Sequence, residues 1–390
     1  MKDIAYNKAV DLLHKVSTPK GFLASSENTA NYQRIWARDG VICGLAALLD
    51  GNEELINTFK NTLITLADNQ HALGHIPSNV FFDEKQKTEV SYGGLAGRVD
   101  TISWFIIGVC NYSSSQRDSS FLDRMYPHIK KGLKLLEAWE FNNNHLIYVP
   151  RSGNWADEYI TEGHIFYDQV LRLWALRCIQ ALKPLNEISQ KIDTVTEIIS
   201  GNYTVGTYDS PYHPKAYSLL DESRHWVAAV SPSGYQTMYD AFGNSLALML
   251  ELGDDQFQNK VIDYSEKLRK SLSLKLLPAF WEPITEKGDD WKLLVNNCKY
   301  EFRNYPFEFH NGGTWSMVNG FYGISVIEKD PKISEEVLQQ IKALNKDQSY
   351  GYYENFHTIN QKPIGIKYCS WSAAAEIMLE QYSNGKRFLI

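Results

Sequence analysis

The chain has 390 residues, of which 44% are hydrophobic and 22% are charged. This balance is typical of an ordered globular protein and excludes an intrinsically disordered chain. The formal net charge of −7 argues against a nucleic-acid partner, which would need a basic face, and favours a neutral small-molecule substrate.

Helical periodicity recurs along the chain, whereas the alternation of a half-buried strand does not. The predicted helices cover residues 5–16, 41–49, 55–67, 99–112, 121–141, 167–182, 185–199, 233–252, 256–274, 317–326, 334–344 and 370–382. Long loops rich in Gly, Asn, Asp, His and Trp lie at 71–98, 148–164, 281–313 and 347–368. Long loops in compact proteins are usually functional, so we expect one helical scaffold with these loops gathered at one end.

Other features of the sequence indicate the cellular compartment of the protein. No apolar run reaches the length of a membrane span, and the N-terminal segment lacks the apolar stretch of a signal peptide. The five cysteines are scattered and form no CxxC pair, which indicates reduced thiols. We therefore expect a cytoplasmic protein with no membrane association.

Two polar clusters stand at the start of apolar helices. Trp36, Arg38 and Asp39 precede the segment 41–49, and Asp100 opens the most apolar helix of the chain. Such residues could simply cap a helix or form a local ion pair. Alternatively, a carboxyl group at an apolar boundary can have its pKa raised by desolvation, as a general acid requires.

A third cluster, Trp155 with Asp157 and Glu158, lies shortly before the predicted helix 167–182. An acidic first turn would be favoured by the helix dipole. The same carboxylates could instead bind hydroxyl groups while Trp155 stacks on a ligand.

The fourth cluster mixes aromatic and polar residues in two loops near the C-terminus. Its candidate site residues are His310, Asn311, Trp315, Tyr353 and Glu354. Aromatic residues in a loop could pack back onto the core. A surface loop rarely needs five such residues in succession, as in Tyr352-Tyr353-Glu354-Asn355-Phe356, which favours a functional role for Tyr353 and Glu354.

Two carboxylates on separate loops are what glycoside hydrolysis requires. One protonates the leaving oxygen, and the other attacks the sugar or activates a water. Asp100 and Glu354 are the candidates for these roles. They lie far apart in the sequence, so only folding could bring them together.

Five motifs occur in order along the chain. They are Trp36-Ala37-Arg38-Asp39, Gly97-Arg98-Val99-Asp100, Trp155-Ala156-Asp157, His310-Asn311-Gly312-Gly313-Thr314-Trp315, and Glu354 followed by Lys362-Pro363-Ile364-Gly365. The chain resembles the six-hairpin glycoside hydrolases, most of all the alkaline and neutral invertases of glycoside hydrolase family 100. It is similar too to the amylo-α-1,6-glucosidase domain of glycogen debranching enzymes.

The resemblance implies an all-α fold, an (α/α)6 barrel that forms a single catalytic domain over residues 1–390, with a funnel-shaped active site on one face. It implies an inverting, exo-acting glycoside hydrolase with Asp100 as general acid and Glu354 as general base. The residues implied to hold or wall the sugar are Trp36, Arg38, Asp39, Trp155, Asp157, His310, Asn311, Trp315 and Tyr353. No cofactor or metal is implied, because both steps are proton transfers.

The chain departs from the family pattern beside these motifs. Thr101 and Ile102 stand where the family has Ser-Gly, and Ser316 and Tyr353 stand where it has proline. The expected substrate is therefore a small neutral sugar, either sucrose or a short α-glucoside. Two alternatives stay open: a glycoside phosphorylase on the same scaffold, in which phosphate replaces water, and a non-catalytic sugar-binding protein.

Overall fold

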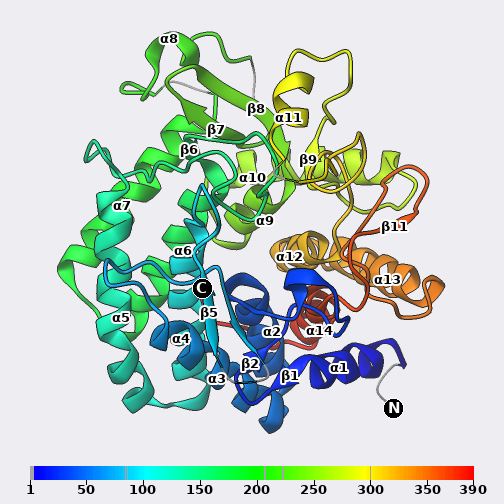
Figure 1. Cartoon of the computed structure of the whole chain (residues 1–390). Helices are drawn as coiled ribbons and strands as arrows, with labels where there is room; N and C mark the ends of the chain where they lie inside the picture. The colour runs from blue at the N-terminus through cyan, green and yellow to red at the C-terminus, as the bar shows by residue number, and fades with distance from the viewer. Residues whose placement is uncertain (1–3, 84, 86, 206–207, 222–223, 299) are drawn as a thin grey trace.

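The computed structural model describes residues 4–390 apart from residues 84, 86, 206–207, 222–223 and 299. Six inner helices form a closed ring, in which each helix contacts the next and the last contacts the first (Figure 1). In ring order they are α2 (Ala37–Asp50), α4 (Asp100–Gln116), α6 (Phe166–Leu182), α9 (Ala241–Met249), α12 (Ser316–Val326) and α14 (Ser370–Ser383). The expected (α/α)6 barrel is confirmed.

Six outer helices surround this ring and alternate with the inner helices along the chain. They are α1 (Ile4–Val16), α3 (Glu53–Asp68), α5 (Ser119–Ala138), α7 (Asn186–Asn202), α10 (Asp255–Ser271) and α13 (Pro331–Asp347). Each packs on an inner neighbour: α1 on α14, α3 on α2, α5 on α4, α7 on α6, α10 on α9 and α13 on α12. In Figure 1, α5, α7 and α13 lie at the rim of the molecule.

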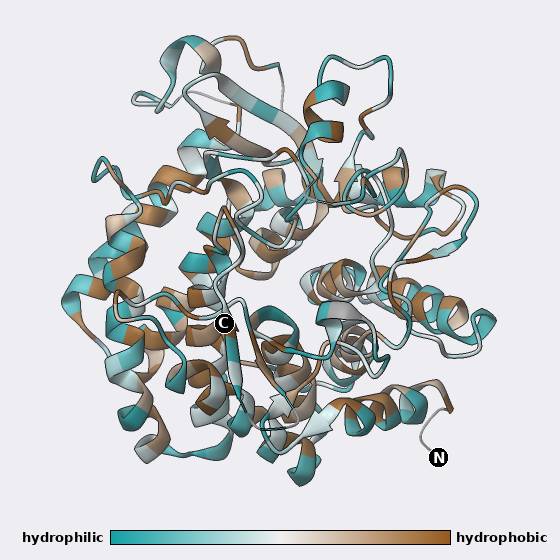
Figure 2. Cartoon of the chain, viewed as in Figure 1, coloured by the Kyte–Doolittle hydropathy of each residue, from teal (hydrophilic) through white to brown (hydrophobic). Residues whose placement is uncertain are grey.

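Burial separates the two rings. Every residue of α4 from Asp100 to Ser113 is buried, as expected for a helix that is covered on all sides. The outer helix α5 buries a single stripe that includes Phe121, Met125 and Ile129. Figure 2 shows the corresponding mixture of hydrophilic and hydrophobic residues along α5 and α13.

Connections that leave an inner helix are short, whereas those that enter one are long. Only Gly51 and Asn52 separate α2 from α3. Gly51 ends α2 in the left-handed conformation, and the Asn52 side chain caps α3 by accepting from the backbone N–H groups of Glu54 and Leu55. By contrast, residues 69–99 lead into α4. The long loops therefore gather where the inner helices begin.

The long loops contain short strands. The largest sheet has the order β6 (His164–Ile165), β7 (Val227–Ser231), β8 (Gly234–Asp240) and β9 (Phe280–Trp281). A second sheet has the order β3 (Ile35–Trp36), β4 (Asn79–Phe82) and β5 (Thr88–Ser91). Two hairpins pair β1 (Ser17–Thr18) with β2 (Gly21–Phe22), and β10 (Asn355–Phe356) with β11 (Pro363–Ile364). The loops also hold the short helices η1 (Ala30–Tyr32), α8 (Pro214–Tyr217) and α11 (Trp291–Asn296).

One predicted helix was wrong in part. The segment 233–252 is not one helix but strand β8 followed by helix α9. Strand β8 pairs with β7 and β9, which compensates for its weak local signal. Asp240 marks the boundary, because its Oδ1 accepts from the N–H groups of Phe242 and Gly243, each at 3.0 Å, and so starts the helix.

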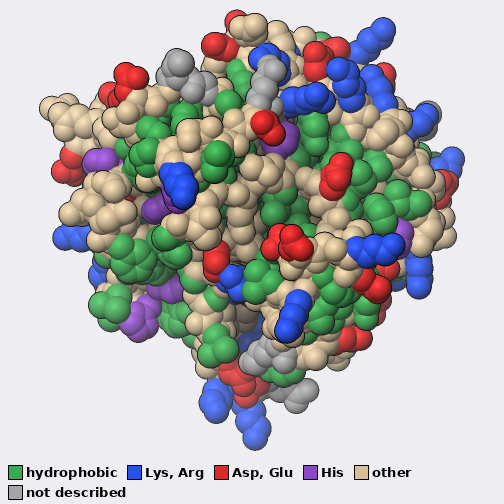
Figure 3. All heavy atoms as spheres, turned by 90° about the horizontal axis from the view of Figure 1, so that it is seen from above, with side chains coloured by type: hydrophobic (Ala, Val, Ile, Leu, Met, Phe, Trp, Pro, Cys, Tyr) green, Lys and Arg blue, Asp and Glu red, His purple; other side chains and the backbone are tan. Residues whose placement is uncertain are grey.

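No described helix is long and apolar enough to cross a membrane. The face drawn in Figure 3 carries acidic and basic side chains interspersed rather than one field of a single sign. That distribution agrees with a neutral ligand better than with a polyanion.

The contact between α12 and α14 generates a stability prediction. A Cβ added at Gly320 would lie 2.8 Å from the Cβ of Ala375 and 3.1 Å from its Cα. The two helix backbones would have to separate, so we expect Gly320→Ala to lower the free energy of unfolding by about 1–3 kcal/mol in urea denaturation. The control is Gly323→Ala on the same helix, which meets the flexible end of Leu379 and should cost less. Equal losses would contradict the backbone contact as the cause.

Candidate active site

The first turns of four inner helices are linked by a polar network. Arg38 of α2 donates from Nη1 to Asp100 Oδ2 of α4 at 2.6 Å. Tyr167 of α6 donates to the same oxygen at 3.2 Å and accepts from Trp104 Nε1 at 2.9 Å. The Arg38 guanidinium also lies over the ring of Trp371 in α14, 5.6 Å from its centre. Side chains from distant parts of the sequence thus meet at one end of the barrel.

Four rings pack beside this network, and we call Trp155, His310, Trp315 and Trp371 the aromatic cluster. Trp155 lies edge-on to His310, with ring centres 4.9 Å apart, and to Trp315 at 5.7 Å. His310 stacks on Trp315 at 4.9 Å, and Trp371 meets Trp315 edge-on at 5.8 Å. Burial lowers the pKa of His310 to about 3, so its ring is neutral at physiological pH.

Several buried polar atoms in this region have no hydrogen-bond partner among the described residues. They are the indole nitrogens of Trp155 and Trp371, Nε2 of His310 and Oδ1 of Asp100. Buried polar groups are normally paired, because leaving one unpaired costs about 1–3 kcal/mol. Their convergence is typical of a site where a polar ligand supplies the missing partners.

Glu354 lies in the loop between α13 and α14, and its side chain is buried. The Tyr32 hydroxyl lies 3.0 Å from both of its carboxylate oxygens, and the Ile366 N–H donates to Oε2 at 3.3 Å. Burial raises the pKa of Glu354 to about 7, although Tyr32 and Arg303 each lower it. Gly365, which has a φ of +75°, makes room, because a Cβ there would overlap Oε2 of Glu354.

Asp157 lies in the loop before α6, and its side chain is 32% exposed. Arg98 Nη2 donates to its Oδ2 at 2.8 Å. Arg98 Nη1 donates to the carbonyls of Gly93 and Gly97, each at 3.1 Å, and of Ser152 at 2.6 Å. Burial raises the pKa of Asp157, but Arg98 and other cationic neighbours outweigh it and hold that pKa below its usual value.

Asp39 connects these groups. Its carboxylate interacts electrostatically with Arg38, Asp100 and Asp157, and it also acts on Glu354. Burial raises the pKa of Asp39 to about 6. Folding therefore brings the three other carboxylates within electrostatic reach of the first turn of α2.

A second ion pair lies beside the same carboxylates. Arg303 donates from Nε and Nη2 to Glu158 Oε2, at 3.1 and 2.9 Å. Its guanidinium lies over the ring of Phe309, 4.9 Å from the centre. Its charge lowers the pKa of both Asp157 and Glu354, so it acts on the two groups at once.

The other predicted sugar-binding residues differ in how they are placed. Trp36 and Tyr353 are half-buried, and both leave part of a ring accessible. Trp36 Nε1 donates to the Asn31 carbonyl at 2.8 Å, which fixes the indole. Tyr353 meets Phe356 edge-on at 6.2 Å. Both residues are therefore partly accessible from solvent.

The side chain of Asn311 is held by backbone groups. It is fully buried and donates to the carbonyls of Ile284 at 2.8 Å and Asn304 at 3.0 Å. Its Oδ1 accepts from the Ile284 N–H at 2.7 Å. The amide is thus engaged with the backbone and shapes the loop that carries it.

Sequence reasoning missed three residues that set the electrostatics of the site: Tyr32, Arg98 and Arg303. Arg98 lay inside the motif that ends in Asp100, yet its partner is Asp157. Tyr32 lies four residues before Trp36, but no feature of the nearby sequence indicated a contact with Glu354. Arg303 carried no sequence signal, because its role depends on two distant loops meeting.

The raised pKa of Glu354 generates a prediction about stability. A glutamate has an ordinary pKa of 4.5, against about 7 here, so between these values the folded state binds more protons than the unfolded state. The free energy of unfolding therefore falls as pH rises through this window, by about 3 kcal/mol. We expect Glu354→Gln to be more stable than the wild type at pH 8 but not at pH 4, in urea denaturation. An equal gain at both pH values would exclude ionisation as the cause.

Comparison with known proteins identifies the family. The family described as alkaline and neutral invertase matches residues 12–208 and 216–384. The chain is 22% identical over 429 residues to cytosolic invertase 1 of Oryza sativa subsp. japonica, covering 95% of this chain and 75% of that protein. It is 21% identical to alkaline/neutral invertase CINV2 of Arabidopsis thaliana, covering 95% and 76%.

Solved structures share the fold. A GH63 mannosylglycerate hydrolase from Thermus thermophilus, in complex with Tris, superimposes with a TM-score of 0.72 at 12% identity, covering 96% of this chain and 99% of that one. A bacterial glucoamylase complexed with acarbose gives 0.63 at 14% identity, covering 99% and 56%. Since the family match spans nearly the whole chain, this protein is a glycoside hydrolase that belongs to the alkaline and neutral invertase family.

Proposed function

We propose that this glycoside hydrolase removes a terminal sugar from sucrose or a short α-glucoside, with inversion at the anomeric carbon. The observation that carries the proposal is the set of buried polar atoms, in and beside the aromatic cluster, that lack a partner among the described residues. Indole N–H groups, a neutral imidazole and a carboxylate oxygen suit the hydroxyl groups of a neutral sugar, and flat rings suit its apolar C–H faces. The invertase names of the relatives support sucrose as the first candidate.

Glu354 is the general base in this proposal. A base works best when its pKa lies near the working pH, and burial raises the pKa of Glu354 to about 7. The Tyr32 hydroxyl holds both carboxylate oxygens in place. Glu354 would take a proton from a water that attacks the anomeric carbon on the face opposite the leaving group.

The general acid must reach the leaving oxygen, and exposure separates the two candidates. The side chain of Asp100 has no exposed surface, and Arg38 and Tyr167 hold its Oδ2, whereas the side chain of Asp157 is 32% exposed. We therefore assign the acid to Asp157 in place of Asp100, and give Asp100 the task of positioning Arg38, with which it forms an ion pair. Arg98 and its cationic neighbours outweigh burial and lower the pKa of Asp157, so the acid role requires that substrate binding raises this pKa.

The proposal treats residues 1–390 as a single catalytic domain, since the inner ring draws on segments from α2 to α14. It places the enzyme in a reducing compartment such as the cytoplasm. The five free cysteines and the name of the cytosolic relative support this placement, while other relatives are named mitochondrial or chloroplastic.

Substitution of the carboxylates tests the roles. Asp157→Asn and Glu354→Gln should each lower turnover of a disaccharide by about 10²–10⁴, the usual contribution of a general acid or base. A glycosyl fluoride needs no protonation to leave, so Asp157→Asn should regain most of its rate on that substrate. Asp100→Asn should lose rate on both substrates to a similar degree, because its loss releases Arg38 from the position in which it would bind the sugar. Steady-state kinetics on the two substrates measures these effects.

The rates on the disaccharide and on the glycosyl fluoride decide whether Asp157 or Asp100 is the general acid. Recovery by Asp100→Asn on the fluoride, with no recovery by Asp157→Asn, would return the acid role to Asp100. Near-native turnover by folded Glu354→Gln would exclude Glu354 as the base. Circular dichroism of each variant establishes that it is folded.

Product stereochemistry tests the mechanism. Screening sucrose and short α-glucosides should identify a substrate whose first-formed sugar has the inverted anomeric configuration, observed by proton NMR early in the reaction. Retention of configuration would exclude the inverting mechanism.

A requirement for phosphate would favour a phosphorylase, which needs no general base and so leaves Glu354 unexplained. Tight sugar binding without turnover would indicate a non-catalytic sugar-binding protein.

A further inference from the structure

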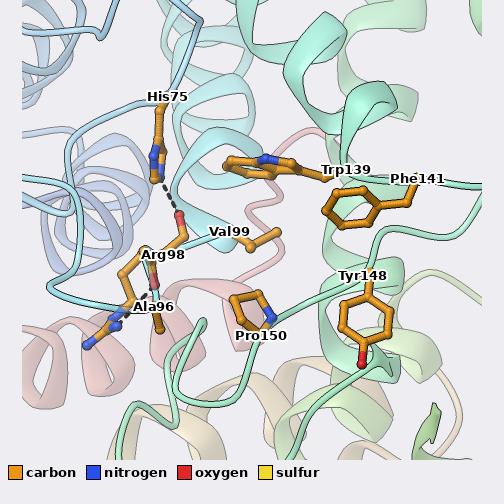
Figure 4. Close-up of a pocket in the computed structure, with 9 residues that line it drawn as sticks. His75, Ala96, Arg98, Val99, Trp139, Phe141, Tyr148 and Pro150 are labelled. Carbon is orange, nitrogen blue, oxygen red and sulfur yellow. Dashed lines mark hydrogen bonds between the residues drawn. The ribbon is translucent and has the colours of Figure 1, made fainter. Parts of the chain in front are cut away.

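A cavity of about 640 Å³ lies between residues 96–99 and residues 139–150 (Figure 4). Its described lining shares no residue with the aromatic cluster. The lining is mainly apolar and includes His75, Val99, Trp139, Phe141, Tyr148 and Pro150. A volume of this size is typical of a site for a small molecule.

The rings that line the cavity are arranged with their flat or apolar parts inward. His75 meets Trp139 edge-on at 5.2 Å, and Phe141 meets Tyr148 edge-on at 6.3 Å. In Figure 4 the Tyr148 hydroxyl and the Trp139 ring nitrogen point away from Pro150, so the walls that remain are aromatic faces and edges. Such walls favour another aromatic ring in stacked or edge-on contact.

The side chain of Phe141 is exposed to solvent, and its backbone adopts a conformation that is unfavourable for a bulky residue. It is 74% exposed, and its φ of +56° lies in the left-handed region that bulky residues rarely adopt. The backbone conformation belongs to the turn that follows α5, since the Phe141 N–H donates to the Ala138 carbonyl at 3.3 Å. The exposed ring itself buries little apolar surface, and a ligand in the cavity would cover it.

The cavity offers little charge to a ligand. Arg98 is the charged side chain of its described lining, and its Nη1 and Nη2 groups donate to Gly93, Gly97, Ser152 and Asp157, while its buried Nε has no partner among the described residues. His75 Nε2 lies 2.8 Å from the Arg98 carbonyl, which makes this nitrogen the donor. A charged or highly hydroxylated ligand would therefore find few partners here.

We propose that this cavity binds a planar aromatic group, and that its occupancy acts on the active site through Arg98. The group would lie against the backbone of residues 97–99, whose Arg98 side chain holds Asp157. It could be the aglycone of a glycoside substrate or a separate aromatic compound. The effect on catalysis rests on the proposed function of Asp157, whereas binding itself does not.

Calorimetric titration of 2-naphthol into the full-length protein tests the binding. We expect binding to the wild type, and at least about tenfold weaker binding to Phe141→Ala and to Tyr148→Ser, since each removes an aromatic wall. The matched control is Leu219→Ala, because Leu219 is 75% exposed, much as Phe141 is, and lies outside the cavity. The control should bind like the wild type. Absence of binding, or equal binding by all four proteins, overturns the proposal.

Two kinetic measurements determine whether the bound aromatic group is the aglycone of a substrate or a separate compound. A higher kcat/KM for a 2-naphthyl glycoside than for the methyl glycoside, reduced in Phe141→Ala, assigns the cavity to the aglycone. A change in methyl glycoside turnover on adding free 2-naphthol, absent in Phe141→Ala, assigns it to a separate compound. Binding with neither effect overturns the action through Arg98. Because the titration needs no turnover, it remains informative even if the proposed function fails.

Discussion

The burial of six helices on all sides is the constraint on which the rest of this structure depends. A helix such as α4, which has no solvent face over most of its length, can place reactive groups at its ends but not along its sides. Polar side chains therefore concentrate in the first turns and in the long loops that lead into them. Arg38, Asp39 and Asp100 are helix-start residues for this reason, and the loops add Asp157 and Glu354 around them.

The same burial makes the site costly to fold. Neutral His310 and the raised pKa values of Asp39 and Glu354 each reflect a charged form that the protein interior disfavours. Donors without a partner among the described residues, such as the indole nitrogen of Trp155, add to this cost. A ligand with several hydroxyl groups would relieve both penalties, so the features that destabilise the barrel are those that would favour sugar binding.

Arg98 connects the candidate active site to the cavity beside it. Its side chain ties the loop that enters α4 to the loop that enters α6, and its backbone forms part of a separate aromatic cavity. Because Arg98 holds Asp157, the proposed catalytic role of Asp157 would make the neighbouring cavity relevant to the reaction. Loops of this kind can vary among relatives with little effect on the barrel, which is how one scaffold serves different substrates.

The sequence by itself determined most of the helices, because helical periodicity is a local property, while the barrel and the candidate site residues followed from the family resemblance that motifs such as those of Trp155, His310 and Glu354 carry. Only the tertiary structure decided that β8 is a strand, that the amide of Asn311 is engaged with the backbone, and that Asp100 is enclosed while Asp157 is open. Strand pairing, hydrogen-bond partners and exposure depend on which distant segments meet, and no local pattern carries that information.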